Sequence, residues 1–321
     1  MVKKIAILTS GGDAPGMNSA VRVCIRAGLA KGKEMYVIYD GYKGLVDGDI
    51  HQVTKEFTAD IMNRGGTIIR SARLPEFKDP AIQKKALQRL RDFEIDALIG
   101  IGGDGTYKGL RDLANQGFPC VGMPGTIDND ISSSDYTIGF MTALNTICEC
   151  IDKIKDTSSS HQRCSVIEVM GRYCGDLAIF SGIAEGAELT VSPDHRPTDE
   201  EIFRKLRRLK AQKKSHAVVV VSENLLDVNE LGRRIEEETE FETKVEILGR
   251  LQRGGSPCAF DRILAARLGA RAVELLDKGM KTNGRVVGQV GGKIVDLEIN
   301  EALSLPRDAH KELVGLIDLL Q

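Results

Sequence analysis

Short apolar runs alternate with longer amphipathic segments along almost the whole chain of 321 residues. Most of the short runs are too apolar to leave one face in water, which is typical of strands buried in a parallel sheet. Strands are predicted at residues 3–9, 35–40, 95–101, 119–123, 163–169, 217–222 and 245–248. Helices are predicted at residues 17–30, 81–93, 107–115, 139–155, 174–184, 199–213, 228–240 and 259–278.

This alternation predicts an α/β fold of the doubly wound type, with mostly parallel sheets, right-handed crossovers and ligand sites at the carboxyl ends of strands. Thr198 followed by Glu201 is a capping box, which marks the start of one helix. A late hairpin is expected between Arg285 and Asp296, and a final helix from about His310. No linker rich in Pro, Ser or Gly separates two domains.

Composition narrows the function classes. The chain has 44 Lys plus Arg against 46 Asp plus Glu, a net charge of −2, which argues against a nucleic-acid partner. The length suggests two domains at about 150 residues each. No apolar run reaches the ~18 residues of a membrane span, so we expect a cytoplasmic protein without a membrane partner. The seven cysteines lack a C-x-x-C pair, which favours reduced structural thiols over a metal or redox role.

Glycine is abundant, at 34 residues, and part of it is placed for chemistry. The order strand, Gly-Gly-Asp, helix occurs twice, with the triplets at 11–13 and 102–104. Bare backbone N–H groups can converge there on an anion at a helix N-terminus, so two such loops suggest a polyphosphate. Neither G-x-x-x-x-G-K-[ST] nor a G-x-G-x-x-G after the first strand is present. Asp104 could hold Mg²⁺ against phosphate oxygens, or it could cap the next helix.

Two carboxylates lie in the segment PGTIDND, residues 124–130. In an extended stretch Asp128 and Asp130 would share a face, one as a base for a hydroxyl that attacks a phosphoryl group and the other beside a metal. A local Asx-turn is the alternative. Glu223 follows the strand 217–222, where it could accept hydrogen bonds from sugar hydroxyls.

Four arginines next to polar or glycine residues are candidates for phosphate recognition, because a guanidinium group pairs with phosphate in bidentate geometry. They are Arg163, Arg172, Arg250 and Arg253. Each alone could be a solvated surface residue, but we expect the set to lie just beyond the apolar strands.

Together these motifs resemble the bacterial ATP-dependent 6-phosphofructokinases over nearly the whole chain. The resemblance is carried by SGGDAPGMN (10–18), IGGDGT (101–106), PGTIDND, DTSSSHQR (156–163), MGRYCGD (170–176) and LQRGGSP (251–257). With glycine at positions 105 and 125, the chain resembles the branch of the family that uses ATP, since relatives that use pyrophosphate generally have Asp and Lys at these positions. GGDGT alone is shared with NAD kinases and lipid kinases, and a non-catalytic sugar-phosphate sensor is a further alternative.

The resemblance implies transfer of the γ-phosphoryl group of ATP to the 1-hydroxyl of fructose 6-phosphate, in a cleft between two doubly wound domains. Asp128 would be the base, with Asp104 and Asp130 at Mg²⁺. The other catalytic residues implied are Arg73, Arg172 and Thr126. ATP would bind to Gly12, Arg73, Leu74, Gly103, Asp104, Gly105 and Thr106. The sugar phosphate would bind to Thr126, Ile127, Asp128, Arg163, Met170, Gly171, Arg172, Glu223, Lys244, Arg250, Leu251, Gln252 and Arg253.

The resemblance also implies a homotetramer, in which Arg163 and Lys244 reach the 6-phosphate from a neighbouring subunit. It implies an ATP-binding domain at 1–138 plus 256–304, and a sugar-phosphate and effector domain at 139–255 plus 305–321. An effector, ADP or phosphoenolpyruvate, would bind to Arg22, Arg26, Lys55, Asp60, Lys155, Gly186, Ala187, Glu188, Gln212, Lys214, Ser215 and His216.

The chain departs from the family pattern at both sites. The family usually has Arg at the position of Lys244 and His at that of Arg250, so we expect altered affinity for the sugar phosphate with the reaction intact. At the effector site Lys55 and Lys155 replace arginines, while Gln212 and Ser215 replace lysines. Fewer phosphate contacts should weaken the coupling, so we expect weak allosteric regulation.

Overall fold

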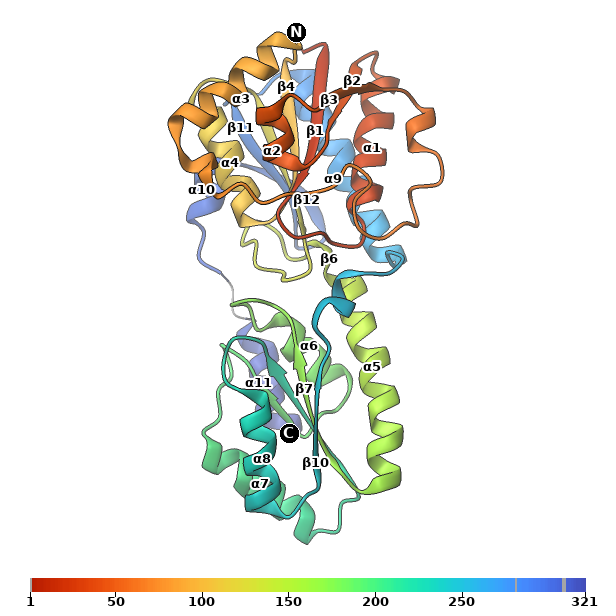
Figure 1. Ribbon diagram of the computed structural model, residues 1–321, viewed down its shortest axis with the longest axis vertical. Helices are drawn as coiled ribbons and strands as arrows, with labels where there is room; N and C mark the ends of the chain where they lie inside the picture. Colours follow the sequence, from red (N-terminus) through yellow and green to blue (C-terminus); the bar gives the residue numbers. More distant parts are fainter. Residues whose placement is uncertain (1, 281, 308–309) are drawn as a thin grey trace. The chain divides into compact units, whose positions relative to one another are not determined.

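Two units of the chain each contain their own, mostly parallel β-sheet, which confirms the predicted α/β class (Figure 1). The computed structural model describes residues 2–280, 282–307 and 310–321. Unit 1 comprises the residues up to Thr142 together with Arg253–Arg307, and unit 2 comprises Ala143–Gln252 with the residues after Arg307. The chain therefore passes from unit 1 to unit 2 and back before its last helix.

The sheet of unit 1 carries the glycine-rich loops. Its main strands lie in the order β12 (Lys293–Glu298), β11 (Gly284–Val290), β5 (Cys120–Thr126), β4 (Ala97–Gly102), β1 (Lys4–Ser10), β2 (Glu34–Ile38) and β3 (Ile50–Val53). The short strand β6 (Ile138–Gly139) pairs with β5. The pairs β11–β12 and β2–β3 are antiparallel and the others parallel. The antiparallel pair β11–β12 is the late hairpin that the sequence predicted.

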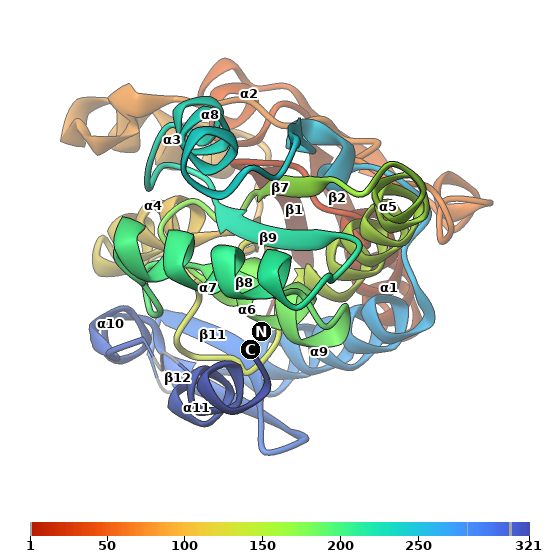
Figure 2. The ribbon, with the colours of Figure 1, turned by 90° about the horizontal axis from the view of Figure 1, so that it is seen from below.

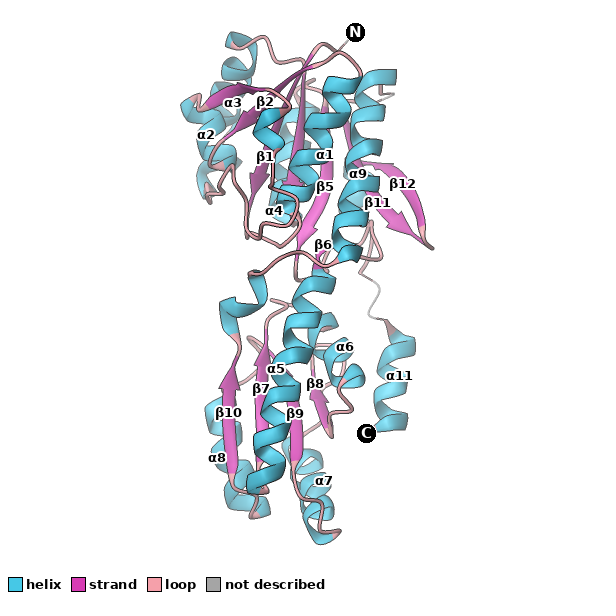
Figure 3. Cartoon of the chain, turned by 90° about the vertical axis from the view of Figure 1, so that its right-hand side faces the viewer, coloured by secondary structure: helices cyan, strands magenta, loops and turns pink. Residues whose placement is uncertain are grey.

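Helices cover both faces of this sheet. Helices α1 (Met17–Ala30) and α9 (Ala259–Lys278) pack together on one face, as Figures 1 and 3 show. The other face is covered by α2 (Gly41–Asp47), α3 (Pro80–Asp92), α4 (Asp104–Asn115) and α10 (Ile299–Ser304). Two short 3-10 turns, Glu56–Thr58 and Pro75–Lys78, lie in the connections. With both faces covered, the central strands β1, β4 and β5 are almost entirely buried, as their continuous apolar character predicts, whereas the edge strands β3 and β12 are partly exposed.

The sheet of unit 2 is fully parallel, in the order β10 (Thr243–Ile247), β7 (Cys164–Val169), β9 (Ala217–Ser222) and β8 (Leu189–Val191) (Figure 3). Its helices are α5 (Phe140–His161), α6 (Asp176–Ala184), α7 (Asp199–Ala211), α8 (Val228–Thr239) and α11 (Lys311–Leu320). Helices α5, α7 and α8 surround β7 and β9 (Figure 2). Val166, Val219 and Val221 form one core with side chains of α7 and α8, and α11 packs on α6. The 3-10 turn η3 (Gly249–Arg253) follows β10 and leads back to unit 1.

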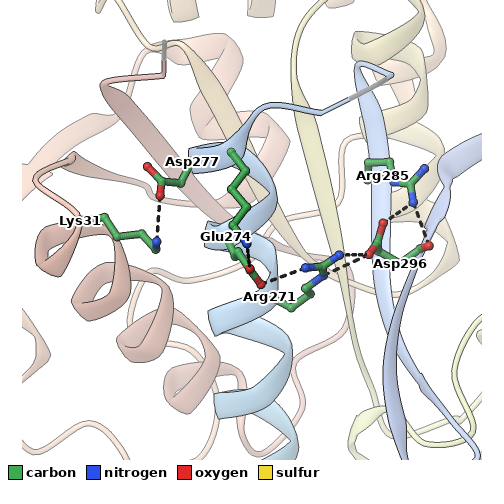
Figure 4. A network of polar contacts seen from close by, with 7 residues as sticks. Lys31, Arg271, Glu274, Asp277, Arg285 and Asp296 are labelled. Atoms are coloured by element: carbon green, nitrogen blue, oxygen red, sulfur yellow. Dashed lines mark hydrogen bonds and ion pairs between the residues drawn. The ribbon is translucent and has the colours of Figure 1, made fainter.

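A polar network joins α9 to its neighbours in unit 1 (Figure 4). Asp277 pairs with Lys31 at 2.8 Å and with Lys33 at 2.7 Å, and these two lysines lower the pKa of Asp277 to about 2. Arg271 of α9 pairs with Asp296 of β12 at 2.6 Å. The network fixes the end of α9 to the start of β2 and to the hairpin.

Burial affects the protonation of the two cysteines Cys24 and Cys164. Cys24 and Cys164 are fully buried thiols, and burial raises the pKa of each to about 12, so both stay protonated at neutral pH.

Within the described ranges, no helix combines the length and apolar character needed to cross a bilayer.

Candidate active site

The two glycine loops meet at one edge of the unit 1 sheet. Because β1 and β4 are parallel neighbours, Gly11 and Gly103, which follow them, lie side by side. The Thr106 hydroxyl donates a 3.1 Å hydrogen bond to the Ser10 carbonyl, and a Cβ on Gly102 would overlap that same carbonyl. The close approach of β1 to the start of α4 therefore requires a residue without a side chain at position 102.

Asp104 occupies the first turn of α4, directly after Gly103. The N-cap is Gly103, so the interpretation of Asp104 as a helix cap is wrong. The Asp104 carboxylate is partly exposed and pairs with Lys108 at 2.6 Å, one turn further along the helix. A carboxylate at a helix N-terminus beside bare backbone N–H groups is placed for a cation that a polyphosphate brings with it.

The segment PGTIDND continues β5 to the same edge of the sheet. A Cβ on Gly103 would lie 3.8 Å from the Thr126 side chain, so the β4 and β5 ends are in contact. Thr126 Oγ1 accepts a hydrogen bond from the Asp128 N–H at 3.2 Å, and its carbonyl accepts one from the Thr137 hydroxyl at 2.6 Å. Asn129, in the left-handed region at φ 54°, accepts from the Thr137 N–H at 2.9 Å. Thr137, which sequence reasoning did not single out, thus fixes the turn that presents Asp128.

The two glycines expected to distinguish ATP from pyrophosphate differ in their surroundings. A Cβ on Gly105 would meet open space among the described residues, so packing alone does not require glycine there. A Cβ on Gly125 would lie 2.9 Å from Ile101, so a larger residue would force β4 and β5 to adjust.

Arg253 lies against the first glycine loop, within unit 1. Its Nη2 is 2.7 Å from Asp13 Oδ1, and a Cβ on Gly12 would sit 2.7 Å from the same nitrogen. Ser71 donates a 2.7 Å hydrogen bond to the Gly11 carbonyl, which brings the segment with Arg73 and Leu74 to this loop. Asp13 is separated from Arg253 by 240 residues, and sequence reasoning missed it.

A second group of predicted residues gathers in unit 2, at the carboxyl ends of β7 and β9. The loop 170–172 has two residues with positive φ, Gly171 at 130° and Arg172 at 58°. Its backbone is held from two sides: Glu223 Oε1 accepts from the Arg172 N–H at 2.7 Å, and Gln252 Oε1 accepts from the Met170 N–H at 3.0 Å. One oxygen of Glu223 therefore accepts a hydrogen bond from the loop and positions it, so this oxygen is not free to accept one from a sugar hydroxyl.

Gln252 differs from its neighbours in the turn Gly249–Arg253. Arg250 and Leu251 are exposed, whereas Gln252 is fully buried. Its Nε2 donates to the Gly249 carbonyl at 3.0 Å. Gln252 therefore joins the turn to the loop 170–172 through both ends of its amide.

Arg163 does not follow a strand, so the expectation that all the candidate arginines lie just beyond apolar strands is wrong. Arg163 precedes β7, and Lys244 is the second residue of β10, so both lie at the amino edge of the unit 2 sheet. The six residues of β7, about 3.3 Å each, separate them from Arg172 and Glu223 at the carboxyl edge. Within one chain, Arg163 and Lys244 therefore lie at the opposite edge of the sheet from the loop 170–172.

The expected effector residues form one group in each unit. In unit 2, Lys155 Nζ pairs with Glu185 Oε2 at 2.9 Å and also contacts the Glu185 carbonyl, next to Gly186 and Ala187. Lys214 pairs with Glu188, whose other oxygen accepts from the Val218 N–H at 2.6 Å. Ser215 contacts His216 at 3.1 Å, and Gln212 is the exposed C-cap of α7.

In unit 1 the expected effector residues lie on α1 and beside it. Arg22 and Arg26 share one face of α1, and burial together with the charge of Arg26 lowers the pKa of Arg22. The Arg26 Nε donates to Thr58 Oγ1 at 2.9 Å, in the short turn that follows Lys55 and precedes Asp60.

Comparison with known proteins supports one family. The chain matches the phosphofructokinase family over residues 4–276. It is 51% identical, over the full length of both chains, to the ATP-dependent 6-phosphofructokinase of Photobacterium profundum. The crystal structure of Pichia pastoris phosphofructokinase is 34% identical, with a TM-score of 0.89 over 100% of this chain and 37% of that one. A pyrophosphate-dependent phosphofructokinase from Marinobacter aquaeolei is 18% identical with a TM-score of 0.86, covering 96% and 85%, and shares the fold.

Proposed function

The chain belongs to the phosphofructokinase family, and we propose how its residues transfer the γ-phosphoryl group of ATP to the 1-hydroxyl of fructose 6-phosphate. The observation that carries the assignment of roles is the meeting of three segments at one edge of the unit 1 sheet: the loop after β1, the loop before α4, and PGTIDND at the end of β5. This one edge of the sheet can bind an anion, and it supplies both a metal-binding carboxylate and a base.

The phosphates of ATP bind along the glycine loops, at Gly12 and at Gly103 to Thr106. The open space at Gly105 leaves room for them. Mg²⁺ suits this donor set, since it takes one or two carboxylates together with phosphate oxygens, and Asp104 and Asp130 would hold it. When bound, Mg²⁺ neutralises charge on the transferring phosphoryl group. Arg73 and Leu74 bind the rest of the nucleotide.

Asp128 accepts the proton of the sugar 1-hydroxyl as the new bond to phosphorus forms. Its turn is fixed by Thr126 and Thr137, so the carboxylate needs little rearrangement before the reaction. General base catalysis typically contributes about 10²- to 10⁴-fold. We therefore expect Asp128→Asn to lower kcat by at least about 100-fold with ATP and sugar KM values near those of the wild type. Activity of the purified variant close to wild type would overturn this role.

In unit 2 the loop 170–172 and the remaining oxygen of Glu223 bind the sugar ring. Arg172, exposed at the tip of the loop, stabilises the charge that develops during transfer. Its positive φ points to a backbone arrangement imposed by the surroundings, since a non-glycine residue rarely adopts it without support.

Arg163 and Lys244 bind the 6-phosphate in the site of a neighbouring subunit, in a homotetramer. The separation of these two residues from Arg172 along β7 supports this, because one chain cannot supply both ends of its own site. Mixing two defective variants tests it. In hybrids of Asp128→Asn with Arg163→Gln, shared sites combine an intact Asp128 from one subunit with an intact Arg163 from the other, so activity returns after the subunits exchange.

If each chain used its own Arg163, every site in such a hybrid would carry one lesion and activity would not return. Light scattering of the wild-type protein reports the assembly independently, and a monomer that is fully active would refute the shared site.

The substitutions in the sugar-phosphate site alter affinity and leave the reaction intact. Lys244 offers a point charge where a guanidinium offers a planar fork, and Arg250 adds a permanent charge on an exposed turn. Lys244→Arg combined with Arg250→His should lower the KM for fructose 6-phosphate, and an unchanged KM would refute this reasoning.

Regulation by ADP or phosphoenolpyruvate is weak in this chain. Two of the cations expected to bind an effector phosphate are already neutralised inside unit 2, Lys155 by Glu185 and Lys214 by Glu188. An effector would have to displace these carboxylates, which lowers its affinity for either state. Initial rates against fructose 6-phosphate should shift little when phosphoenolpyruvate is added, and a strongly sigmoidal shift would refute the proposal.

A further inference from the structure

We infer that Glu242 is a positioning residue for the sugar-phosphate site, which holds Arg163 and Lys244 together for one phosphate group. The inference rests on the proposed function, in which these two cations bind the 6-phosphate of fructose 6-phosphate. Glu242 itself has no assigned role in that function, and it acts through the two cations rather than on a reacting atom.

The geometry converges on a single oxygen atom. Glu242 Oε1 lies 2.8 Å from both Nε and Nη2 of Arg163 and 3.2 Å from Nζ of Lys244. Arg163 comes from the connection between α5 and β7, whereas Glu242 and Lys244 flank the start of β10. The shared acceptor therefore brings to one point two cationic groups that come from different segments of unit 2.

Hydrogen-bond capacity remains for a ligand. The guanidinium group has five N–H donors, and Glu242 engages its Nε–H side, which leaves the Nη1 pair and one Nη2–H. The Lys244 ammonium has three donors, one of which faces Glu242. A phosphate has three terminal oxygens that can accept several of these donors at once.

Charge supports the same arrangement. The two cations lower the pKa of Glu242, first through the hydrogen bond with Arg163 and then through Lys244, so its carboxylate is ionised at neutral pH. The Glu242 carboxylate offsets the repulsion between Arg163 and Lys244 before the ligand binds. Two cations and one anion leave a net charge of +1, which still attracts a dianion. All three side chains are partly exposed, so each contact alone is weak and the benefit lies in fixing their geometry.

The test replaces Glu242 by Gln, which keeps the shape and one carbonyl oxygen but removes the charge. Glu246→Gln, an exposed acid on the same strand, is the matched control. We expect Glu242→Gln to raise the KM for fructose 6-phosphate by about three- to tenfold, while kcat and the KM for ATP stay within about twofold. The inhibition constant of inorganic phosphate, competing with fructose 6-phosphate, should rise by the same factor. A purely structural role would instead change kcat or the melting temperature.

Arg163→Gln, alone and combined with Glu242→Gln, separates the possible failures. We expect the single Arg163 variant to raise the KM at least as much, and the double variant to add little, because Glu242 acts through Arg163. If Arg163→Gln raises the KM but Glu242→Gln leaves it unchanged or lowers it, the inference is wrong and the proposed function stands. If neither variant changes the KM, Arg163 does not bind the 6-phosphate, and this part of the proposed function is wrong together with the inference.

Discussion

Replacing Gln252 by Leu tests whether a buried amide sets the activity of the loop 170–172. Gln252 is fully buried, and it bonds the Met170 N–H at 3.0 Å and the Gly249 carbonyl at 3.0 Å. Leu has a similar volume, so the substitution removes the two hydrogen bonds and opens little space. The change therefore isolates the polar connection between the loop and the turn Gly249–Arg253.

The magnitude follows from what the substitution leaves behind. A buried donor or acceptor that loses its partner costs about 1–3 kcal/mol. Met170 and Gly249 are partly exposed, so water can replace part of each bond, and we expect a loss of about 1–3 kcal/mol in total. The loop adds a second effect, because Arg172 holds a positive φ that costs about 1–2 kcal/mol for a residue other than glycine. With one of its two anchors gone, the backbone at Arg172 can relax away from the site.

The expected result is a fall of about 10- to 100-fold in kcat/KM for fructose 6-phosphate, since each ~1.4 kcal/mol of lost transition-state stabilisation is a factor of ten. The KM for ATP should stay near the wild-type value, because the glycine loops belong to unit 1. The rate of fructose 1,6-bisphosphate formation in a coupled assay measures both constants. Gln88→Leu, an exposed residue of α3, is the matched control and should leave the kinetics unchanged.

A wild-type kcat/KM in Gln252→Leu would refute the reasoning, provided that the melting temperature shows the variant to be folded. A loss of stability with unchanged kinetics would refute it equally, because the amide would then support the turn without setting the conformation of the loop.

Three further predictions concern stability and the second glycine loop. Asp261 is fully buried and accepts from the N–H groups of Gly139 and Thr142, so Asp261→Ala should lower the free energy of unfolding by about 3–5 kcal/mol, measured by urea denaturation. Gly102→Ala should destabilise unit 1 and abolish activity, because the added Cβ overlaps the Ser10 carbonyl; a folded, active variant would contradict this. The folded-state pKa of Asp277 is about 2, below the ordinary value of 3.8, so its ion pairs stabilise the fold above about pH 4 and are lost between pH 4 and 2. The difference in urea midpoint between wild type and Asp277→Asn should accordingly shrink over that interval.

The sequence predicted the regular elements well where the signal is local. The bounds of α1, α9 and β9 agree with the predicted ranges at both ends, and the capping box at Thr198 is present. Apolar runs, caps and helix-breaking residues are all properties of neighbouring positions, so they can be recognised without the fold. The helix predicted at 139–155 instead extends to His161. The prediction ended too early because the last turns of the helix are polar and carry no apolar periodicity.

Elements whose signal depends on tertiary packing were missed. Helix α2 contains Gly41 and Gly44, which are typical of a loop, yet a Cβ on Gly44 would overlap the Tyr39 carbonyl, so the glycine is there for packing. Strand β8 has only three residues, too few for a period to show. In both cases the chain outside the element decides its conformation.

The candidate site could be predicted as a set of motifs but not as a set of contacts. Which residue of the turn Gly249–Arg253 points inward is decided by the packing of unit 2, so Gln252 could not be distinguished from Arg250 in the sequence. The predicted strand 163–169 begins at Arg163, so the position of this residue at the amino end of β7 follows better from the strand bounds than from the grouping of arginines.

Several of the cations that the motifs and the resemblance assigned to phosphates already have an acidic partner in their own unit. Arg253 pairs with Asp13, Arg163 with Glu242, and Lys214 with Glu188. Each pair is partly exposed, so its own contribution to stability is small. Binding of a phosphate is then an exchange of one anion for another, and its free energy is a difference between two similar interactions. The near-zero net charge of the chain is the sum of such pairs, and it therefore reveals nothing about where the phosphates bind.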